Sequence, residues 1–274
     1  MTKNRILVTG YKGYIGSHLY AKLKEMGHRV RGIDLKEGDD IKHSLPSEEF
    51  DYVFHMAALP SVQYSVENPS YTLLQNVYAT SVLLQWAKEH NVRRVIFSSS
   101  AAAIGEDGNL TSPYGMHKKM SEMECRLYSQ LYGLDTVCLR YFNVYSEDQK
   151  YGGAYSTVIS AWMHMIEHGN PLRIDGDGEQ TRDFIHVGDI VGSNIFCMNH
   201  ENDLNGRILN VASGKSVSLK YIKSFIDSKN ENVEWSVVPS RDGDIKHSSS
   251  DITDILNLGW NPTILIEDGL NKCF

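Results

Sequence analysis

The chain has 274 residues, of which 41% are hydrophobic, and its 27 basic and 34 acidic side chains give a net charge of −7. A chain of this size and composition buries roughly three quarters of its unfolded surface, which excludes a disordered protein. The acidic balance, without any Lys/Arg block, excludes a nucleic-acid partner. No stretch approaches 18 uncharged apolar residues and the start MTKNRILVTG has no apolar leader, so we expect a cytoplasmic protein with no membrane partner.

Short runs rich in Val and Ile alternate with longer segments of helical period. The expected strands are 5–9, 29–33, 51–55, 94–98 and 136–140. Several of these runs are apolar at consecutive positions, which is typical of strands covered on both faces. The alternation therefore predicts an α/β fold with a Rossmann-type, doubly wound parallel sheet. We expect a first domain at 1–144 and a smaller C-terminal lobe at 145–274, with 184–208 either in that lobe or packed back onto the first domain.

Two long helices are expected, at 69–90 and 113–132. In the second, methionine and leucine recur at intervals of three or four residues, at Met116, Met120, Met123 and Leu127. Such a stripe marks one face of a helix. We predict that it packs in the core, with a dimer seam as the alternative.

A glycine-rich turn joins the first expected strand to the first helix, as Gly10-Tyr-Lys-Gly13-Tyr-Ile-Gly16. Glycines permit a tight turn and a close approach of the backbone to a pyrophosphate, while the N-terminus of the helix offers N–H groups and the positive end of its dipole. In this strand–turn–helix context the pattern predicts a dinucleotide site.

An acidic residue, Asp34, ends the second expected strand about twenty residues after the glycines, at the spacing of a ribose-binding carboxylate. A carboxylate there accepts hydrogen bonds from ribose hydroxyls and repels a 2′-phosphate, which favours NAD over NADP. The neighbouring Arg31 leaves a mixed preference open. Asp40 and Ile41 are candidates to hold the adenine, and a solvated loop is the other interpretation.

Tyr114 and Lys118 lie four residues apart, on one face of the helix that begins after Ser112. Lowering the pKa of a phenol from about 10 to about 7 takes roughly 4 kcal/mol. One ammonium about 4 Å away supplies about 4 kcal/mol at an effective dielectric near 20. With a serine from the run 98–100 at a strand end, the pair predicts a proton and hydride transfer on a sugar hydroxyl.

With these motifs in place, the sequence resembles the extended short-chain dehydrogenase/reductases, specifically the NAD-dependent nucleotide-sugar epimerase/dehydratase family. The resemblance covers almost the whole chain. It includes GYKGYIG at 10–16, HMAA at 55–58, FSSSAAAIG at 97–105, YGMHK at 114–118, RYFNVYS at 140–146, GDGEQTRDFIHVGD at 176–189, NVASG at 210–214 and RDGDIKHSSSD at 241–251.

The resemblance implies a site residue by residue. The catalytic group would be Ser100, Tyr114 and Lys118. The NAD-binding residues would be Gly10, Gly13, Tyr14, Ile15, Gly16, Asp34, Leu35, Asp40, Ile41, Ala57, Ala58, Asn76, Tyr114, Lys118 and Tyr141. The C-terminal lobe would bind a nucleotide diphosphate-sugar, and a homodimer through a four-helix bundle would explain the two long helices.

The substrate contacts that the resemblance implies include Ser100 and a diphosphate contact at Asn143. Arg182 and Arg241 match guanidinium groups that hold the substrate phosphates, Asp244 matches a carboxylate on the nucleotide ribose, and Ser248 matches a side chain beside the sugar. Permanently charged, bidentate donors suit a diphosphate in an acidic protein. The small Ser248 would leave room for a 2-N-acetyl group.

Within this family, dehydratases carry an Asp-Glu pair after the catalytic residue, where this chain has Ala101 and Ala102. Since this chain lacks those ionisable groups, the main prediction is NAD-dependent C4 epimerisation through a transient 4-keto sugar. We predict that a UDP-linked and N-acetylated sugar is the preferred substrate. An NAD(P)H-dependent 4-ketosugar reductase is the alternative, followed by a 4,6-dehydratase and a non-catalytic NAD-binding protein.

No metal site is expected. His164 and His168 lie one helical turn apart. Without a carboxylate motif, we predict a solvated helix face there rather than a pair of metal ligands.

Overall fold

A computed structural model describes residues 3–105, 108–153, 156–230, 232–239 and 250–274. The chain divides into two units, which are described in turn. The first unit comprises Met1–Tyr141 and Ile190–Asn210, and the second comprises Phe142–Asp189 and Val211–Phe274. In the part of the chain that the model covers, no helix is both long and apolar enough to cross a membrane.

A six-stranded sheet with the order β2-β1-β3-β4-β5-β9 forms the centre of the first unit. Its strands are β1 (Arg5–Thr9), β2 (Arg29–Ile33), β3 (Tyr52–His55), β4 (Arg94–Ser100), β5 (Asp135–Tyr141) and β9 (Arg207–Val211). The pairs β1–β2, β1–β3, β3–β4 and β4–β5 are parallel, which confirms the predicted Rossmann-type sheet. The strand order reverses between β1 and β3, at the position where such sheets bind dinucleotides.

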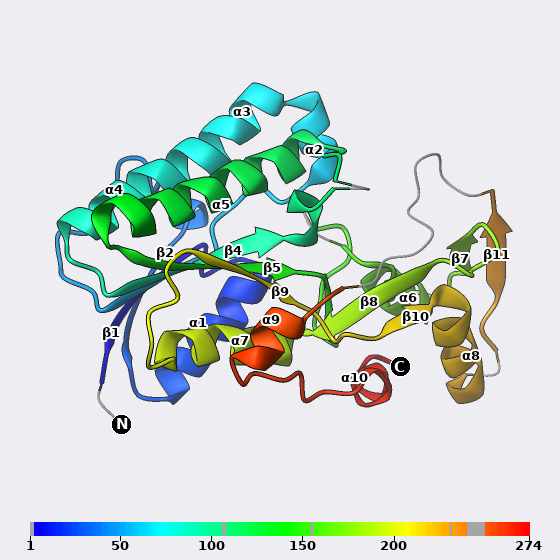
Figure 1. The fold of residues 1–274 in the computed structure, drawn as a ribbon. Helices are drawn as coiled ribbons and strands as arrows, with labels where there is room; N and C mark the ends of the chain where they lie inside the picture. Colours follow the sequence, from blue (N-terminus) through cyan, green and yellow to red (C-terminus); the bar gives the residue numbers. More distant parts are fainter. Residues whose placement is uncertain (1–2, 106–107, 154–155, 231, 240–249) are drawn as a thin grey trace. The chain divides into compact units, whose positions relative to one another are not determined.

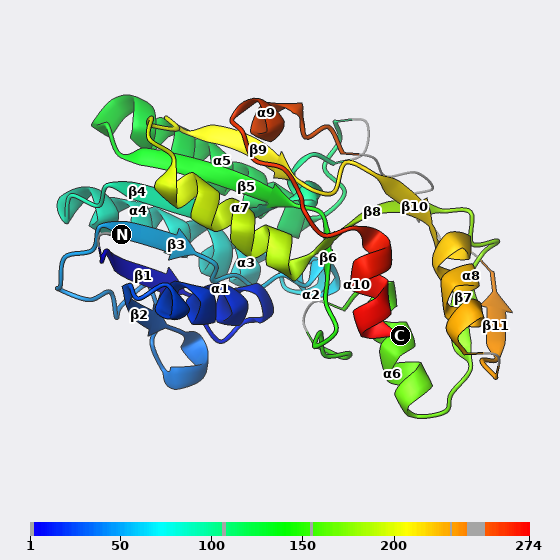
Figure 2. The same ribbon diagram turned by 90° about the horizontal axis from the view of Figure 1, so that it is seen from below.

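Helices cover both faces of this sheet (Figures 1 and 2). On one face lie α1 (Tyr14–Glu25) and α7 (Val187–Asn199), and on the other lie α3 (Pro69–Leu73), α4 (Ala79–Glu89) and α5 (Pro113–Tyr132). The expected helix at 69–90 is present, but a π-helical turn, η2 (Leu74–Tyr78), separates α3 from α4. Single π-turns inside helices occur mostly at functional sites.

The methionine stripe of α5 does not lie in the core, so that prediction was wrong. Met116, Met123 and Leu127 are 49%, 64% and 47% exposed. The buried face of α5 instead carries mostly polar residues, namely Tyr114, Gly115, His117, Lys118, Ser121, Glu122 and Cys125. Polar residues are buried on this face because β4 and β5, the strands beneath the helix, offer polar partners to the Glu122 carboxylate.

The second unit contains two small sheets. The three-stranded sheet has the order β10-β8-β6 and the two-stranded sheet pairs β11 with β7. These strands are β6 (Asn143–Tyr145), β7 (Leu172–Asp175), β8 (Thr181–His186), β10 (Ser216–Ser218) and β11 (Trp235–Val238). The helices of this unit are α6 (Val158–Glu167), α8 (Leu219–Lys229), α9 (Thr253–Asn257) and α10 (Ile266–Cys273). Of these helices, α6, α8 and α10 pack around a core that includes Trp162, Phe184 and Ile222.

The remaining short elements of the first unit lie in the loops that follow its strands. They are η1 (Leu35–Glu37) after β2, α2 (Val62–Glu67) after β3, and η3 (Ala101–Ala103) after β4. Each therefore begins at the carboxyl edge of the sheet, where ligands of open α/β sheets bind.

Candidate functional site

The glycine turn after β1 is built from contacts that leave no space for a side chain. Gly10 has a φ of +68°, and a Cβ on it would lie 2.7 Å from the Ala57 Cα. A Cβ on Gly16 would lie 2.2 Å from the Gly10 carbonyl oxygen. Gly13 begins α1, where no side chain caps the helix, and the half-buried Tyr14 and Ile15 follow it. A helix N-terminus of this kind fits a bound diphosphate, so these residues suit a dinucleotide.

Replacing Gly16 tests this turn, because Gly16→Ala places a methyl group against backbone atoms that cannot move aside. We expect the free energy of unfolding to fall by about 1–3 kcal/mol and NAD affinity to fall with it. Gly153→Ala is the matched control, since among the described residues its Cβ would meet the Lys150 carbonyl oxygen alone, at 3.8 Å. Calorimetric titration with NAD and denaturant unfolding measure both effects. Wild-type NAD affinity in Gly16→Ala would contradict the assignment.

Asp34 lies at the end of β2 and is 8% exposed. Its carboxylate accepts hydrogen bonds from the Lys12 and Lys36 amides, both at 2.9 Å. A carboxylate has about four lone-pair sites, so two remain for ribose hydroxyls. The Arg31 guanidinium forms an ion pair with Glu48, and both side chains are exposed.

The other predicted cofactor residues near Asp34 differ in exposure. Leu35 is 53% exposed, whereas Ile41 is 8% exposed. The Asp40 carboxylate forms an ion pair with the Lys42 ammonium at 2.8 Å. Its charge is therefore partly compensated within its own loop.

A buried polar network supports the loop after β3, where Ala57 and Ala58 are half-buried. His55 bonds to the Thr9 hydroxyl at 2.8 Å and to the Thr80 hydroxyl at 2.9 Å. The Thr9 hydroxyl also accepts a hydrogen bond from the Ala57 amide. Sequence reasoning did not identify this network, because no motif links three residues so far apart in the chain.

Asn76 lies in the π-turn η2 and holds the same loop from the other side. Its amide oxygen accepts from the Leu59 N–H at 2.8 Å, and its amide nitrogen donates to the Leu59 carbonyl at 3.1 Å. Asn76, one of the predicted NAD-binding residues, therefore contacts the loop after β3. Tyr141, at the end of β5, is buried and bonds through its hydroxyl to Asn194. Burial raises the pKa of the Tyr141 phenol, which keeps it protonated.

Ser100 ends β4, and Tyr114 and Lys118 lie on α5, which packs against β4 and η3. Ser100 is the last residue of β4, and its hydroxyl accepts from the Ala102 amide to begin η3. The Lys118 ammonium donates to the Ser98 carbonyl at 2.6 Å and lies 5.9 Å from the centre of the Tyr114 ring. A Cβ on Gly115 would lie 2.4 Å from the Ala102 carbonyl oxygen, so this glycine allows α5 to approach η3.

Electrostatics around Lys118 depend on a buried carboxylate one turn later. Burial lowers the pKa of Lys118 to about 8, and Glu122 opposes that shift. Glu122 is fully buried and accepts two hydrogen bonds from Arg140, at 2.6 and 2.7 Å, and one from Ser99 at 2.7 Å. The amine at the site thus titrates close to neutral pH, which is typical of functional groups.

In the second unit, Asn143 and Arg182 lie on neighbouring strands of the three-stranded sheet. The Asn143 side chain donates to the Asp183 carbonyl at 2.9 Å, and the Arg182 guanidinium donates to the Thr181 carbonyl. Arg241, Asp244 and Ser248 lie outside the described residues.

Sequence reasoning missed Asp183, the carboxylate next to Arg182. It is fully buried and accepts hydrogen bonds from the Ser213 hydroxyl and amide, the Gly214 amide and the Ser250 hydroxyl. Burial raises the pKa of this carboxyl even though these bonds act in the opposite direction. Asp183 thereby ties the NVASG segment to β8.

Comparisons with known proteins identify the family of the chain. The model of the NAD dependent epimerase/dehydratase family matches residues 6–212. A putative UDP-glucose 4-epimerase of Methanocaldococcus jannaschii is 32% identical over 301 residues, covering 97% of this chain and 96% of the relative.

Two solved structures are also similar. A UDP-N-acetylglucosamine 4-epimerase from Methanobrevibacter ruminantium, in complex with UDP-N-acetylmuramic acid, has a TM-score of 0.91 and 32% identity, covering 100% of this chain and 97% of that one. A UDP-glucuronic acid 4-epimerase from Bacillus cereus, in complex with UDP-glucuronic acid and NAD, has a TM-score of 0.82 and 28% identity, covering 98% and 97%. The chain therefore belongs to the NAD-dependent epimerase/dehydratase family, as its motifs predict.

Proposed function

We propose that this protein is an NAD-dependent 4-epimerase of a UDP-linked sugar, with a 2-N-acetylated sugar preferred. The observation that carries the proposal is that Ser100, at the end of β4, leads into a turn, η3, made only of alanines, while α5 carries Lys118 with its ammonium 5.9 Å from the centre of the Tyr114 ring. Epimerisation at C4 needs one base for one hydroxyl. It needs no second acid or base in the positions that η3 fills with Ala101 and Ala102.

The chain's own residues have separate tasks in this reaction. Tyr114, as phenolate, takes the proton of the C4 hydroxyl and later returns it. The Lys118 ammonium stabilises that phenolate by charge, and the Ser100 hydroxyl holds the sugar oxygen in place. Bound NAD supplies the hydride acceptor and donor for C4. The glycine turn and Asp34 would hold this cofactor through its diphosphate and ribose.

The titration of Lys118 gives a prediction on pH. The ammonium is present below its pKa of about 8 and is lost above it, so we expect turnover to fall as pH rises through about 8. Lys118→Met should abolish most turnover without lowering stability at pH 7. The ordinary pKa of lysine is 10.5, and burial lowers it in the folded protein, so below pH 8 the buried ammonium lowers the free energy of unfolding. Methionine carries no charge and removes this destabilisation.

Activity measured from pH 6 to 10 tests the expected fall in turnover, and denaturant unfolding at pH 7 tests the expected stability of Lys118→Met. Lys88→Met, on the exposed end of α4, is the matched control and should change neither. An activity that stays level through pH 9, or a Lys118→Met variant that turns over normally, would contradict the role of the ammonium.

The two units would divide the work of binding. We assign NAD to the sheet domain at 1–144, whose core belongs to the first unit, and the nucleotide sugar to the lobe at 145–274. Arg182 and Arg241 would hold the diphosphate with Asn143, and Asp244 would bind the ribose. Ser248 matches a position beside the sugar in the family, and its small size supports the preference for a 2-N-acetyl group. A similar protein of that specificity supports it further.

A homodimer in the cytoplasm completes the proposal. Exposed apolar side chains gather on α2, α3, η2 and α5, including Tyr71, Leu73, Tyr78, Met116, Met123 and Leu127. Single exposed apolar residues are ordinary, but a series along adjacent helices marks an interaction surface. Pairing of two copies through these helices would form the four-helix bundle that the family resemblance implies.

The function is tested by incubating the purified protein with UDP-glucose, UDP-glucuronic acid and UDP-N-acetylglucosamine without added reductant, and following the C4 proton by NMR. We expect inversion at C4, greatest for UDP-N-acetylglucosamine. Conversion of UDP-glucose alone would overturn the N-acetyl preference. A requirement for stoichiometric NAD(P)H would instead identify a 4-ketosugar reductase.

A further inference from the structure

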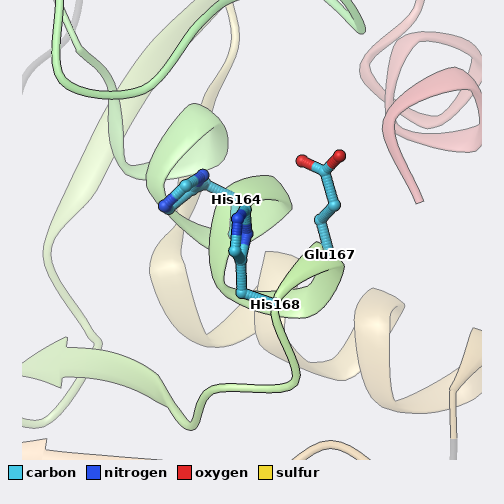
Figure 3. Close-up of side chains that lie close together, drawn as sticks. All are labelled: His164, Glu167 and His168. Atoms are coloured by element: carbon cyan, nitrogen blue, oxygen red, sulfur yellow. The ribbon is translucent and has the colours of Figure 1, made fainter.

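A cluster of three metal-binding side chains lies at the end of α6, in the second unit. His164, Glu167 and His168 each offer one ligand atom, and these atoms all lie within 4.8 Å of one another. Figure 3 shows the two imidazole rings side by side, with the Glu167 side chain rising from the same turn. His164 is half-buried and the other two are exposed. None of the three belongs to the epimerase site.

A neighbouring group holds each of the two imidazole rings. The His168 Nδ1 donates to the His164 carbonyl at 2.8 Å, which leaves its Nε2 as the ligand nitrogen. A hydrogen bond of this kind from the other ring nitrogen fixes the tautomer of metal-binding histidines. The His164 ring stacks on Tyr151, with centroids 4.9 Å apart, and lies 4.1 Å from the His168 ring.

The donor set indicates the class of metal. Two imidazoles and one carboxylate suit Zn²⁺ and its neighbours, whereas Ca²⁺ and Mg²⁺ prefer oxygen ligands only. Two nitrogens on one tetrahedral Zn²⁺ lie about 3.3 Å apart, given Zn–N bonds of about 2.0 Å. The ligand atoms lie within 4.8 Å of one another and would reach that spacing through rotations of the three side chains. The C-terminal end of α6 also attracts a cation through its dipole.

We propose that His164, Glu167 and His168 bind one divalent transition metal ion, with Zn²⁺ as the probe and water as the fourth ligand. The sequence predicted a solvated helix face because no carboxylate motif was recognised. Glu167 supplies the missing carboxylate, since it lies three residues after His164 on the same helix face. The bound ion would link side chains across the last turn of α6 and stabilise the end of that helix.

Calorimetric titration of the full chain with Zn²⁺ tests the site. We expect one ion per chain in the wild type and affinity at least about tenfold lower in His164→Gln and in His168→Gln. His200→Gln is the matched control, because the His200 Nδ1 also donates to a backbone carbonyl, that of Asn202, yet His200 is outside the cluster. Metal-free unfolding of each variant should match the wild type.

A separate measurement, the visible spectrum of bound Co²⁺, tests whether Glu167 is a ligand. Four-coordinate Co²⁺ absorbs strongly in the visible range, and Glu167→Gln should weaken Zn²⁺ binding and change the Co²⁺ spectrum. Absence of Zn²⁺ uptake by the wild type, or equal uptake in the two histidine variants, would overturn the proposal. An unchanged Co²⁺ spectrum in Glu167→Gln would overturn the three-ligand site.

Discussion

Tyr114→Phe is expected to lower kcat for the UDP sugar by about 10²–10⁴-fold while NAD remains bound, because only the hydroxyl that carries the proton is lost. The ring stays in place, since Tyr114 is 8% exposed and its backbone N–H donates to the Ser65 hydroxyl at 3.0 Å. Steady-state kinetics by NMR give kcat and KM, and the absorbance of the purified protein gives its NAD content. We expect KM to change much less than kcat.

The control for this variant is Tyr132→Phe, at the other end of the same helix, where the side chain is 49% exposed. This variant also removes a phenolic hydroxyl from α5, and it should leave kcat unchanged. A Tyr114→Phe variant with a near-normal rate would refute the assignment of the base. Loss of NAD together with activity would show that the hydroxyl binds cofactor instead of moving a proton.

Arg94→Ala should lower the free energy of unfolding by about 3–5 kcal/mol, the cost of leaving a buried carboxylate without its partner. Arg94 is 1% exposed and pairs with Asp135, which is 6% exposed. The guanidinium also donates to four carbonyls within and after α7, those of Cys197, Met198, His200 and Asn202. On the other side, the Asp135 carboxylate accepts from the Leu204 and Asn205 amides, both at 2.8 Å.

Denaturant unfolding measures this loss, with Arg29→Ala on the exposed edge strand β2 as the control. Arg94→Lys should fall between the wild type and Arg94→Ala, because an ammonium cannot reach all the acceptors of a planar guanidinium. If Arg94→Ala unfolds at the wild-type denaturant concentration, the pair does not anchor the segment after α7. Typical stabilities are about 5–15 kcal/mol, so a loss of the expected size is easily detected.

Local patterns predicted much of the sheet. Strands β1 and β2 and helix α5 begin and end where the sequence predicts, because consecutive apolar residues and the Ser112-Pro113 start are signals within a few residues. The ends of β4 and β5 were less accurate. The prediction stopped at Ser98, whereas β4 runs to Ser100, since parallel pairing with β5 sustains the strand after its apolar run ends.

The buried face of α5 could not be predicted in the same way. Periodicity assigns apolar residues to the core, but here Glu122 is buried because Arg140 and Ser99, from two strands, satisfy its oxygens. That compensation depends on tertiary contacts between residues far apart in the chain.

The most direct test of the central claim is a reaction with a UDP sugar deuterated at C4, carried out in ordinary water with catalytic NAD. The account predicts that both epimers keep the deuterium at C4, because the hydride that leaves the carbon returns to it within the same site. Mass spectrometry and NMR of the two epimers measure its retention. Loss of the deuterium to solvent would contradict the account.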